Sequence, residues 1–323
     1  MLLITGGAGV MGQKLVRALA LTYSHHKIRV LCLPGDAAAD RLKNDAVEIV
    51  YGDITRPETL VSALKGVETV YHLAAVILAP GHPEIFLRVN VEGTRNLLEA
   101  SMVAGVVHFI YVSSVSVLYP SLNAYARSKL AAEELVKNSG LPRFTIVRPA
   151  LAYEDGGSAE FMHFVDYLRR GKVIFLPAGG EAKKNPVHIE DLVQGFLALL
   201  DNPRVDGKIY HFAGGEIVTL RQMAESLLLY MGKPKVVLSV PIWACRLGVA
   251  AMGVWTRLSG KPHLFTAQSL SGLLEDAVPN LHEAREDLGY RPRSFSQGLE
   301  ELHSLRNCLN PRASVIASRT LAP

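Results

Sequence analysis

The side chains of this chain best suited to proton chemistry are Tyr125 and Lys129, which lie four positions apart in a helical pattern at residues 122–137. Residues four apart share one face of a helix. A positive charge beside a phenol favours the phenolate, so this spacing predicts a lowered pKa for Tyr125 and proton exchange closer to neutral pH. A tyrosine and a lysine at this spacing also occur on ordinary solvated helix surfaces. The pair alone therefore does not establish an active site.

Hydroxyl groups lie upstream of this pair. Residues 109–112 are apolar and predict a buried strand, which ends at Ser113 and Ser114. A serine at that position can hydrogen-bond to a substrate oxygen. Ser114 is favoured for this role, and Ser113 and Ser116 are the alternatives because predicted strand ends carry errors of a few residues.

A glycine-rich turn follows the first apolar run. Residues 1–5 predict a strand, and Gly6, Gly9 and Gly12 follow before an amphipathic helical pattern begins. Glycines let the backbone approach a pyrophosphate closely, and the N-terminus of a helix attracts negative charge. The strand, turn and helix together predict a binding site for the phosphates of a dinucleotide.

Apolar runs alternate with helical patterns through the first half of the chain. Such alternation predicts an α/β fold, a Rossmann-type doubly wound parallel sheet with helices on both faces. Ligands of such sheets bind at the carboxyl ends of the strands, where Gly6, Asp53, His72 and Ser114 fall. The expected strands are residues 28–33, 47–51, 69–72, 107–112 and 144–147, and the clearest helix is 84–104.

Composition describes an ordinary globular protein. The 323 residues are 49% hydrophobic and 20% charged, with a net charge of +4 and scattered basic residues that give no sign of nucleic-acid binding. The three cysteines, Cys32, Cys245 and Cys308, are far apart, so neither a disulfide framework nor a metal site is expected. A cytoplasmic protein without a signal peptide is expected.

One apolar segment, residues 241–255, contains both tryptophans and is interrupted by Arg246. A membrane-spanning helix needs about 20 largely uncharged residues, so spanning is not expected. We predict that the segment packs in the core or forms a wall of the substrate cavity. Peripheral attachment to a membrane is the alternative.

These motifs, in this order, resemble the extended short-chain dehydrogenases/reductases of the NAD-dependent epimerase/dehydratase type. The resemblance is good over about the first 215 residues and looser beyond them. The matching strings are Thr5-Gly6-x-x-Gly9-x-x-Gly12, Gly52-Asp53-Ile54, His72-Leu73-Ala74-Ala75, Asn90-Val91-Glu92-Gly93-Thr94, the Ser114, Tyr125 and Lys129 triad, Val147-Arg148-Pro149-Ala150, and Pro186-Val187-His188-Ile189-Glu190-Asp191.

The resemblance implies hydride transfer between a nicotinamide and a hydroxyl or keto carbon of a small-molecule substrate. It makes Ser114, Tyr125 and Lys129 the catalytic residues: Tyr125 exchanges the hydroxyl proton, Lys129 holds the nicotinamide ribose, and Ser114 orients the substrate oxygen. The implied cofactor-binding residues are Gly6, Gly9, Val10, Met11, Gly12, Asp36, Asp53, Ile54, Leu73, Ala74, Ala75, Asn90, Tyr125, Lys129 and Pro149.

The choice of cofactor depends on the end of the second strand. Cys32 and Leu33 stand where NAD-specific relatives carry an acidic residue and NADP-specific ones have an arginine nearby. Asp36 could reach the ribose and Arg41 could reach a phosphate. NAD is slightly preferred over NADP, because an obvious phosphate-binding arginine is missing.

The substrate is the least determined property. By resemblance, Lys184 and Arg293 would contact the diphosphate of a nucleotide-sugar, which is narrowly favoured, although both could equally be solvated surface charges. The apolar segment favours instead a 3β-hydroxysteroid dehydrogenase or dihydroflavonol reductase-like activity. Only eleven positions separate Ser114 from Tyr125, which admits a non-catalytic nucleotide-binding scaffold. His188 is expected to be a packed core residue rather than a base.

The resemblance also implies the organisation of the chain. Residues 1–152 plus 187–213 would form the dinucleotide-binding domain and residues 153–186 plus 214–305 a smaller C-terminal α/β substrate domain, with a tail at 306–323. Relatives usually form homodimers through a four-helix contact, which helices 84–104 and 122–137 would permit.

Overall fold

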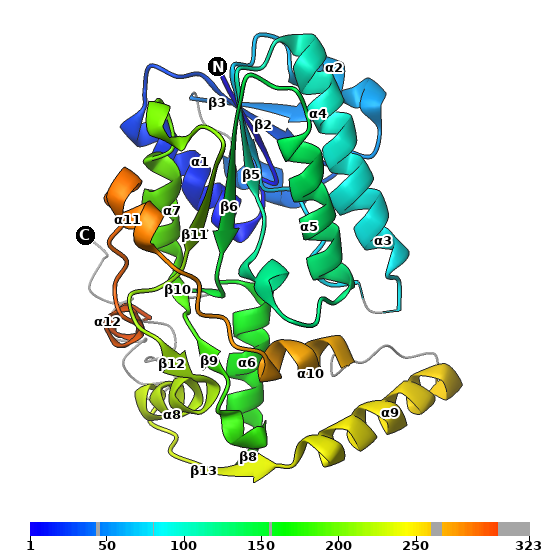
Figure 1. Ribbon diagram of the computed structural model, residues 1–323, viewed down its shortest axis with the longest axis vertical. Helices are drawn as coiled ribbons and strands as arrows, with labels where there is room; N and C mark the ends of the chain where they lie inside the picture. The colour runs from blue at the N-terminus through cyan, green and yellow to red at the C-terminus, as the bar shows by residue number, and fades with distance from the viewer. Residues whose placement is uncertain (43–45, 80, 155–156, 260–266, 303–323) are drawn as a thin grey trace, which may run out of the picture.

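The computed structural model describes residues 1–42, 46–79, 81–154, 157–259 and 267–302, and a seven-stranded parallel sheet lies at its centre (Figure 1). The strand order is β11-β6-β5-β4-β1-β2-β3, with every neighbouring pair parallel. The predicted doubly wound α/β fold is therefore confirmed. The strands are β1 (Leu2–Thr5), β2 (Ile28–Cys32), β3 (Val47–Tyr51), β4 (Thr69–His72), β5 (His108–Val112), β6 (Arg143–Pro149) and β11 (Lys208–Phe212).

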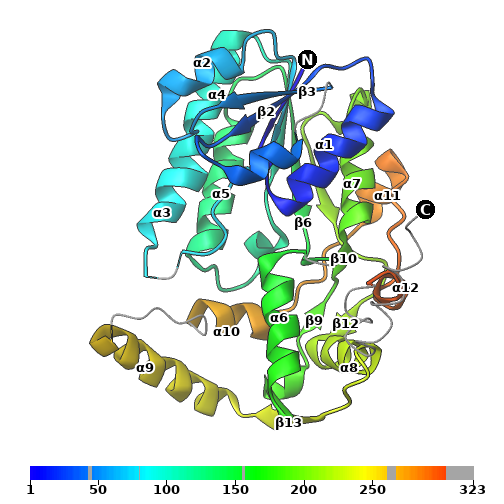
Figure 2. The same cartoon turned by 180° about the vertical axis from the view of Figure 1, so that it is seen from behind.

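Helices cover both faces of the sheet (Figures 1 and 2). Helices α1 (Val10–Thr22) and α7 (Ile189–Leu197) pack on the face that receives Leu2 and Ile4 of β1. Helices α2 (Leu60–Ala63), α4 (Gly93–Ala104) and α5 (Ala124–Lys137) pack on the opposite face with Leu3. Successive strand side chains point to opposite faces, so a strand buried on both sides reads as a continuous apolar run.

The predicted helix at residues 84–104 is interrupted by a wider turn. It consists of α3 (Glu84–Phe86), a π-helical stretch η3 (Leu87–Glu92) and α4. The wide stretch contains Asn90, whose buried side chain bonds to both backbone groups of Val76. π-helical turns are frequent at functional sites, and this one ties the helix to the loop after β4.

Below the carboxyl ends of the strands lies a second apolar core, which includes Phe161, Met223, Leu227 and Phe295. It occupies the region expected for the substrate domain, and the domain boundaries stay a prediction. The predicted tail at 306–323 lies outside the described residues. The elements here are β7 (Ala152–Tyr153), α6 (Ala159–Arg170), β8 (Val173–Pro177), β9 (Lys183–Lys184), β10 (Val187–His188), β12 (Val218–Thr219), α8 (Leu220–Tyr230), β13 (Val236–Val240), α9 (Ile242–Ser259), α10 (Ala267–Leu274) and α12 (Phe295–Glu300). Helix α11 (His282–Leu288) packs instead against β11 of the main sheet.

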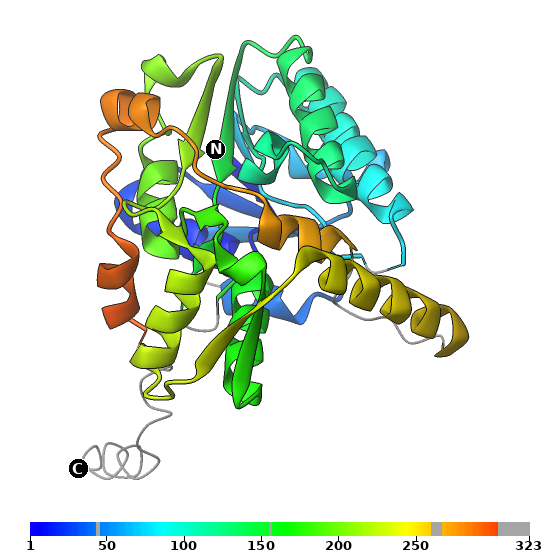
Figure 3. The ribbon, with the colours of Figure 1, turned by 60° about the horizontal axis from the view of Figure 1, so that its bottom comes forward.

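The apolar segment at residues 241–255 is not a core element. It forms most of α9, which extends away from the body of the protein (Figures 1 and 3). The side chains of Trp243 and Trp255 are 67% and 66% exposed, so the prediction of core packing is wrong for both. None of the helices in the described ranges combines the length and apolar character needed to cross a membrane.

A buried ion pair joins helix α5 to the sheet. Glu133 of α5 is fully buried, and Arg148 of β6 donates two hydrogen bonds to its carboxylate, at 2.9 and 2.6 Å. Removing one partner of such a pair leaves an uncompensated charge in a poorly solvated place. The neighbouring Glu134 makes a 2.7 Å ion pair with Lys137 on the surface of the same helix.

We predict that Glu133→Gln lowers the free energy of unfolding by about 3 kcal/mol, because Arg148 loses its counter-charge. The matched control Glu134→Gln should change it by about 0.5 kcal/mol or less, because exposed pairs contribute little. Urea unfolding of both variants measures the difference. Equal losses in the two variants would contradict the importance assigned to the buried pair.

Candidate active site

The sheet brings the predicted site residues to one edge. Gly6 follows β1, Asp53 follows β3, Leu73 follows β4, Ser114 follows β5 and Pro149 ends β6. Because all these strands are parallel, their carboxyl ends meet between the sheet and the second core (Figure 1). The structure therefore places residues from distant parts of the sequence along one edge of the sheet.

The glycine-rich turn has the geometry of an anion cradle. Gly6 has a φ of +71°, and a Cβ atom there would lie 2.6 Å from the backbone nitrogen of Ala74. A Cβ at Gly12 would collide with the Gly6 carbonyl. Helix α1 begins at Gly9, where no side chain caps the first N–H groups. Uncapped N–H groups on an exposed helix start fit a pyrophosphate.

A chain of buried hydrogen bonds starts at the end of β1. Thr5 Oγ1 lies 2.7 Å from His72 Nδ1, and His72 Nε2 lies 2.9 Å from Thr94 Oγ1. Thr94 Oγ1 donates in turn to the carbonyl of Asn90, at 2.7 Å. Burial, aided by the charge of Lys129, lowers the pKa of His72 to about 3, so the ring is neutral at physiological pH. The chain links β1, β4 and the helix after β4.

Asn90 extends this chain of hydrogen bonds to helix α5, which carries Tyr125 and Lys129. Its side-chain amide accepts a hydrogen bond from Val76 N at 2.8 Å and donates to Val76 O at 2.9 Å. It also donates to Ser128 Oγ at 3.0 Å, and Ser128 Oγ donates to the carbonyl of Tyr125 at 2.7 Å. Sequence reasoning missed Ser128, because a helical serine gives no sign of the distant partner that it meets.

Tyr125 lies beside Ser114. Burial and the negative charge of Glu160 raise the pKa of the Tyr125 phenol, and they outweigh the hydrogen bond from Ser114 to the phenol oxygen, which lowers it. The spacing with Lys129 predicted a lowered pKa, so that prediction is wrong for this structure. Glu160 belongs to α6, and nothing in the sequence indicates that it comes close.

Of the three candidate serines, Ser114 is the only one that is not fully buried. It begins the short 3₁₀ turn after β5, and its Oγ accepts hydrogen bonds from Ser116 N and Ser116 Oγ at 3.2 and 3.0 Å. Ser116 thus supports Ser114 rather than competing with it. The geometry favours Ser114 as the residue that faces a ligand.

Lys129 is a buried ammonium group on the same helix. Its Nζ lies 4.2 Å from the centre of the Tyr111 ring, and burial lowers its pKa to about 7 despite the charge of Glu133. Within the described ranges, no hydrogen bond to Nζ is found, and the buried Tyr111 Oη and Ser113 Oγ also lack partners. Unsatisfied polar groups at a strand end fit a polyhydroxyl ligand such as a ribose.

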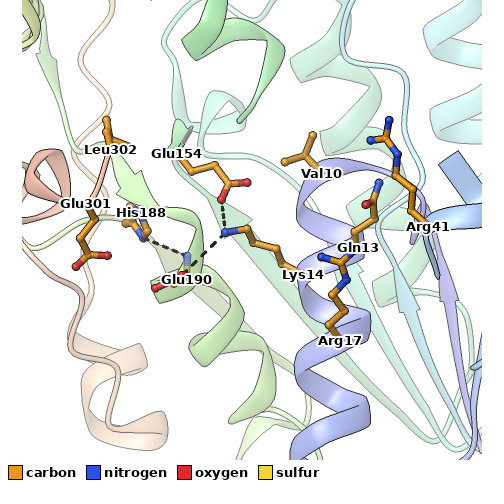
Figure 4. A pocket seen from close by; sticks show the side chains of 10 residues that line it. All are labelled: Val10, Gln13, Lys14, Arg17, Arg41, Glu154, His188, Glu190, Glu301 and Leu302. Atoms are coloured by element: carbon orange, nitrogen blue, oxygen red, sulfur yellow. Dashed lines mark hydrogen bonds and ion pairs between the residues drawn. The ribbon is translucent and has the colours of Figure 1, made fainter. Parts of the chain in front are cut away.

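The two residues considered for the choice between NAD and NADP, Asp36 and Arg41, follow β2 in the chain. Asp36 accepts a hydrogen bond from Ala38 N at 2.9 Å, and its charge adds to burial in raising the pKa of the Cys32 thiol to about 11. Arg41 and Arg17 line a cavity of about 330 Å³ along α1 (Figure 4). Asp36 therefore lies close to the end of β2, Arg41 follows it five positions later in the chain, and Arg17 is on α1.

The other side of this cavity is lined by basic and acidic side chains that pair with one another. Lys14 forms an ion pair with Glu154 and lies 4.0 Å from a carboxylate oxygen of Glu190 (Figure 4). His188, Glu190 and Glu301 are close enough to share a metal ion. Arg293, however, pairs with both Glu190 and Glu301, which opposes cation binding. His188 is buried edge-on against Tyr153, as expected for a packed histidine.

The two residues expected to meet a substrate diphosphate are engaged elsewhere. Lys184 is buried, and its Nζ donates to the carbonyls of Gly272, at 2.8 Å, and Glu275. Arg293 donates to Asp191 through both its backbone N–H and its Nε, each at 3.0 Å. Neither group is a free cation at the crevice, and burial lowers the pKa of Lys184 to about 8.

Comparison with known proteins gives one family. A sequence profile of the NAD dependent epimerase/dehydratase family matches residues 2–213. A 3 beta-hydroxysteroid dehydrogenase/Delta 5-->4-isomerase of Mycobacterium tuberculosis is 28% identical over 95% of this chain and 89% of its own length. A ceramide reductase of Caulobacter vibrioides is 31% identical over 81% of this chain and 80% of its own length.

A solved structure is similar along the whole chain. A double mutant of DesIV, a dTDP-glucose 4,6-dehydratase of Streptomyces venezuelae solved with NAD bound, superimposes with a TM-score of 0.73. It is 26% identical, and the match covers 97% of this chain and 98% of the other. The sequence profile, the relatives and this structure agree on the fold and on the class of enzyme.

We predict that Lys129→Met increases the free energy of unfolding, by about 4 kcal/mol at pH 6. The lysine pKa is about 7 in the folded protein and 10.5 in the reference state, so the unfolded chain binds more protons between those values. Burial of the ammonium therefore costs most below pH 7, and the gain from methionine should shrink as pH rises to 10.

The measurement is urea unfolding of wild type and variant at pH 6, 8 and 10. Lys137→Met, a lysine change in the last turn of the same helix, is the control and should show no such trend. A gain from Lys129→Met that is the same at all three pH values would contradict the lowered lysine pKa.

Proposed function

This chain belongs to the NAD dependent epimerase/dehydratase family, and on that premise we propose that it interconverts a hydroxyl and a keto carbon of an apolar small molecule. Its family and relatives make it an NAD-dependent oxidoreductase of the extended short-chain dehydrogenase/reductase type. The proposal concerns the residues that act and the class of substrate. The class of substrate is supported by Lys184 and Arg293, whose side chains are both bonded to groups within the protein.

In the proposed mechanism, Tyr125 exchanges the hydroxyl proton at its Oη atom, and Ser114 Oγ orients the substrate oxygen. The raised pKa of Tyr125 keeps the phenol protonated, which suits it to donate a proton during reduction of a ketone. Lys129 supplies a buried ammonium, with a pKa near neutrality, to ribose hydroxyls. Bound NAD(P) supplies the redox step as hydride donor or acceptor.

The residues present fit a dinucleotide. The uncapped N-terminus of α1 would hold the pyrophosphate, with Gly6, Gly9, Val10, Met11 and Gly12 around it. NAD stays slightly preferred over NADP, because Asp36 lies near the end of β2, where the ribose hydroxyls are expected. The remaining proposed contacts are Asp53, Ile54, Leu73, Ala74, Ala75, Asn90 and Pro149, which all lie at or behind the carboxyl edge of the sheet.

The single observation behind the substrate class is that both expected diphosphate ligands are occupied within the protein. Lys184 bonds to backbone carbonyls of the segment after α9, and Arg293 bonds to Asp191. A nucleotide-sugar diphosphate would need free cations in their place. Two relatives are named for a steroid and for ceramide, which are apolar molecules and need no such cations.

A nucleotide-sugar is the second candidate, supported by the likeness to a dTDP-glucose 4,6-dehydratase. A non-catalytic scaffold has less support, because Ser114, Tyr125 and Lys129 are all present and Ser114 contacts Tyr125. We also propose the two-domain division given by the sequence. A homodimer through α4 and α5 is proposed as well, because Met102 and Val103 of α4 are exposed.

Tyr125→Phe should reduce kcat about 10²- to 10⁴-fold, because the proton donor is lost. The Kd for NADH should change by less than about twofold, because phenylalanine keeps the shape of the ring. Steady-state kinetics and fluorescence titration of NADH measure the two quantities. Full activity in the variant would remove Tyr125 from the mechanism.

The substrate class is tested by comparing an apolar ketone with a nucleotide-sugar. We expect reduction of a steroid or long-chain 3-oxo compound with kcat/KM at least about 100-fold above that for any turnover of UDP-glucose or dTDP-glucose. Oxidation or formation of NADH at 340 nm and product chromatography give the comparison. Preferential turnover of a nucleotide-sugar would establish the second candidate instead.

A further inference from the structure

Helix α9 presents an apolar stripe to solvent. Trp243, Leu247 and Val254 are all more than half exposed, and at 3.6 residues per turn they fall within about 40° of one another around the helix. Cys245 is buried on the opposite side. The stripe therefore points away from the protein, whereas an ordinary surface helix turns its apolar face inward.

The stripe continues onto the neighbouring strands. The two-stranded ribbon of β8 and β13 leads directly into α9 at the lower end of the molecule (Figures 1 and 2). Phe175 and Leu238 are paired across the ribbon, and both are exposed. Ribbon and helix together expose apolar groups well beyond the scattered single residues that are normal on a protein surface.

The lysines and arginines in the stretch of sequence around α9 are not accompanied by acidic residues. Between Glu225 and Glu275 the sequence contains no Asp or Glu. It contains five basic residues there: Lys233, Lys235, Arg246, Arg257 and Lys261. Arg246 is exposed, directly before Leu247 and about one turn after Trp243 along α9. An apolar stripe carried by a basic stretch of sequence without Asp or Glu is complementary to a surface that is apolar inside and negative outside.

We propose that α9 and the β8–β13 ribbon dock onto an anionic lipid bilayer. The helix would lie in the plane of the interface, with Trp243, Leu247 and Val254 among the acyl chains and Arg246 at the phosphates. Tryptophan favours this boundary because its ring is apolar with one polar N–H. The 18-residue helix carries Arg246 within it, which suits lying on a membrane rather than crossing it.

The buried Lys184 connects α10, and through it α9, to the body of the protein. Its Nζ holds the carbonyls of Gly272 and Glu275, at and just beyond the end of α10, and α10 packs against α9. The docking helix is thereby attached to β9 of the protein body rather than hanging on a single strand. The inference goes beyond the proposed reaction, since docking requires neither cofactor nor substrate.

The chain's own fluorescence tests the proposal, because its only two tryptophans, Trp243 and Trp255, both lie on α9. Vesicles of phosphatidylcholine with 30% phosphatidylglycerol should shift the emission to shorter wavelength and sediment the full-length protein. Binding to phosphatidylcholine vesicles should be at least about tenfold weaker, and 0.5 M salt should weaken binding to the anionic vesicles.

The double variant Leu247→Asp/Val254→Asp keeps both tryptophans and should bind anionic vesicles at least about tenfold more weakly. Leu21→Asp, at a leucine on α1 that is even more exposed than Leu247, is the matched control and should bind like wild type. Both leucine positions are on the surface, and circular dichroism confirms folding of each variant.

Three results would overturn the proposal. These are no binding to anionic vesicles, equal binding to neutral and anionic vesicles, and equal loss in the Leu21→Asp control. Light scattering after size exclusion supplies a fourth. A wild-type dimer that the double variant converts to monomers, without vesicle binding by either, would assign the stripe to a second copy of this chain.

Discussion

The site depends on the two hydrogen bonds that the neutral imidazole ring of His72 makes, to Thr5 and to Thr94. Thr94 gives its hydroxyl proton to the Asn90 carbonyl, so His72 Nε2 must donate to Thr94 and Nδ1 must accept from Thr5. Thr5 Oγ1 can then accept from Ala74 N, at 3.3 Å. A charged ring would have two donors and would break this order, which is why its pKa of about 3 matters.

This ordered chain couples the two halves of the site. Its first member ends the strand before the glycine turn, and its last contacts reach Ser128 and the carbonyl of Tyr125. The cradle and helix α5 are thus held by one set of bonds, and displacement of either would leave buried polar groups unpaired. Lys129 is the contrasting case, a buried ammonium for which no such bonds are found in the described part of the chain.

The lower half of the protein uses its cations for structure. Lys184 and Arg293 tie the segments after α9 and α11 to the body, so neither cation is free to meet a diphosphate. The exposed stripe on α9 is apolar. An enzyme for lipid-like ketones and a surface that docks on lipid agree with each other, although each is tested separately.

The sequence by itself determined the sheet and the residue types at its carboxyl edge. Periodic apolar runs gave strands such as 47–51 and 69–72 to the residue, and the spacing of Gly6, Gly9 and Gly12 located the cradle, because these depend on local patterns. Only the tertiary structure decided the raised pKa of Tyr125, the use of Lys184 and Arg293, and the exposure of α9. Each of these depends on which distant groups come within a few ångströms, such as Glu160 beside Tyr125, and a local pattern holds no record of them.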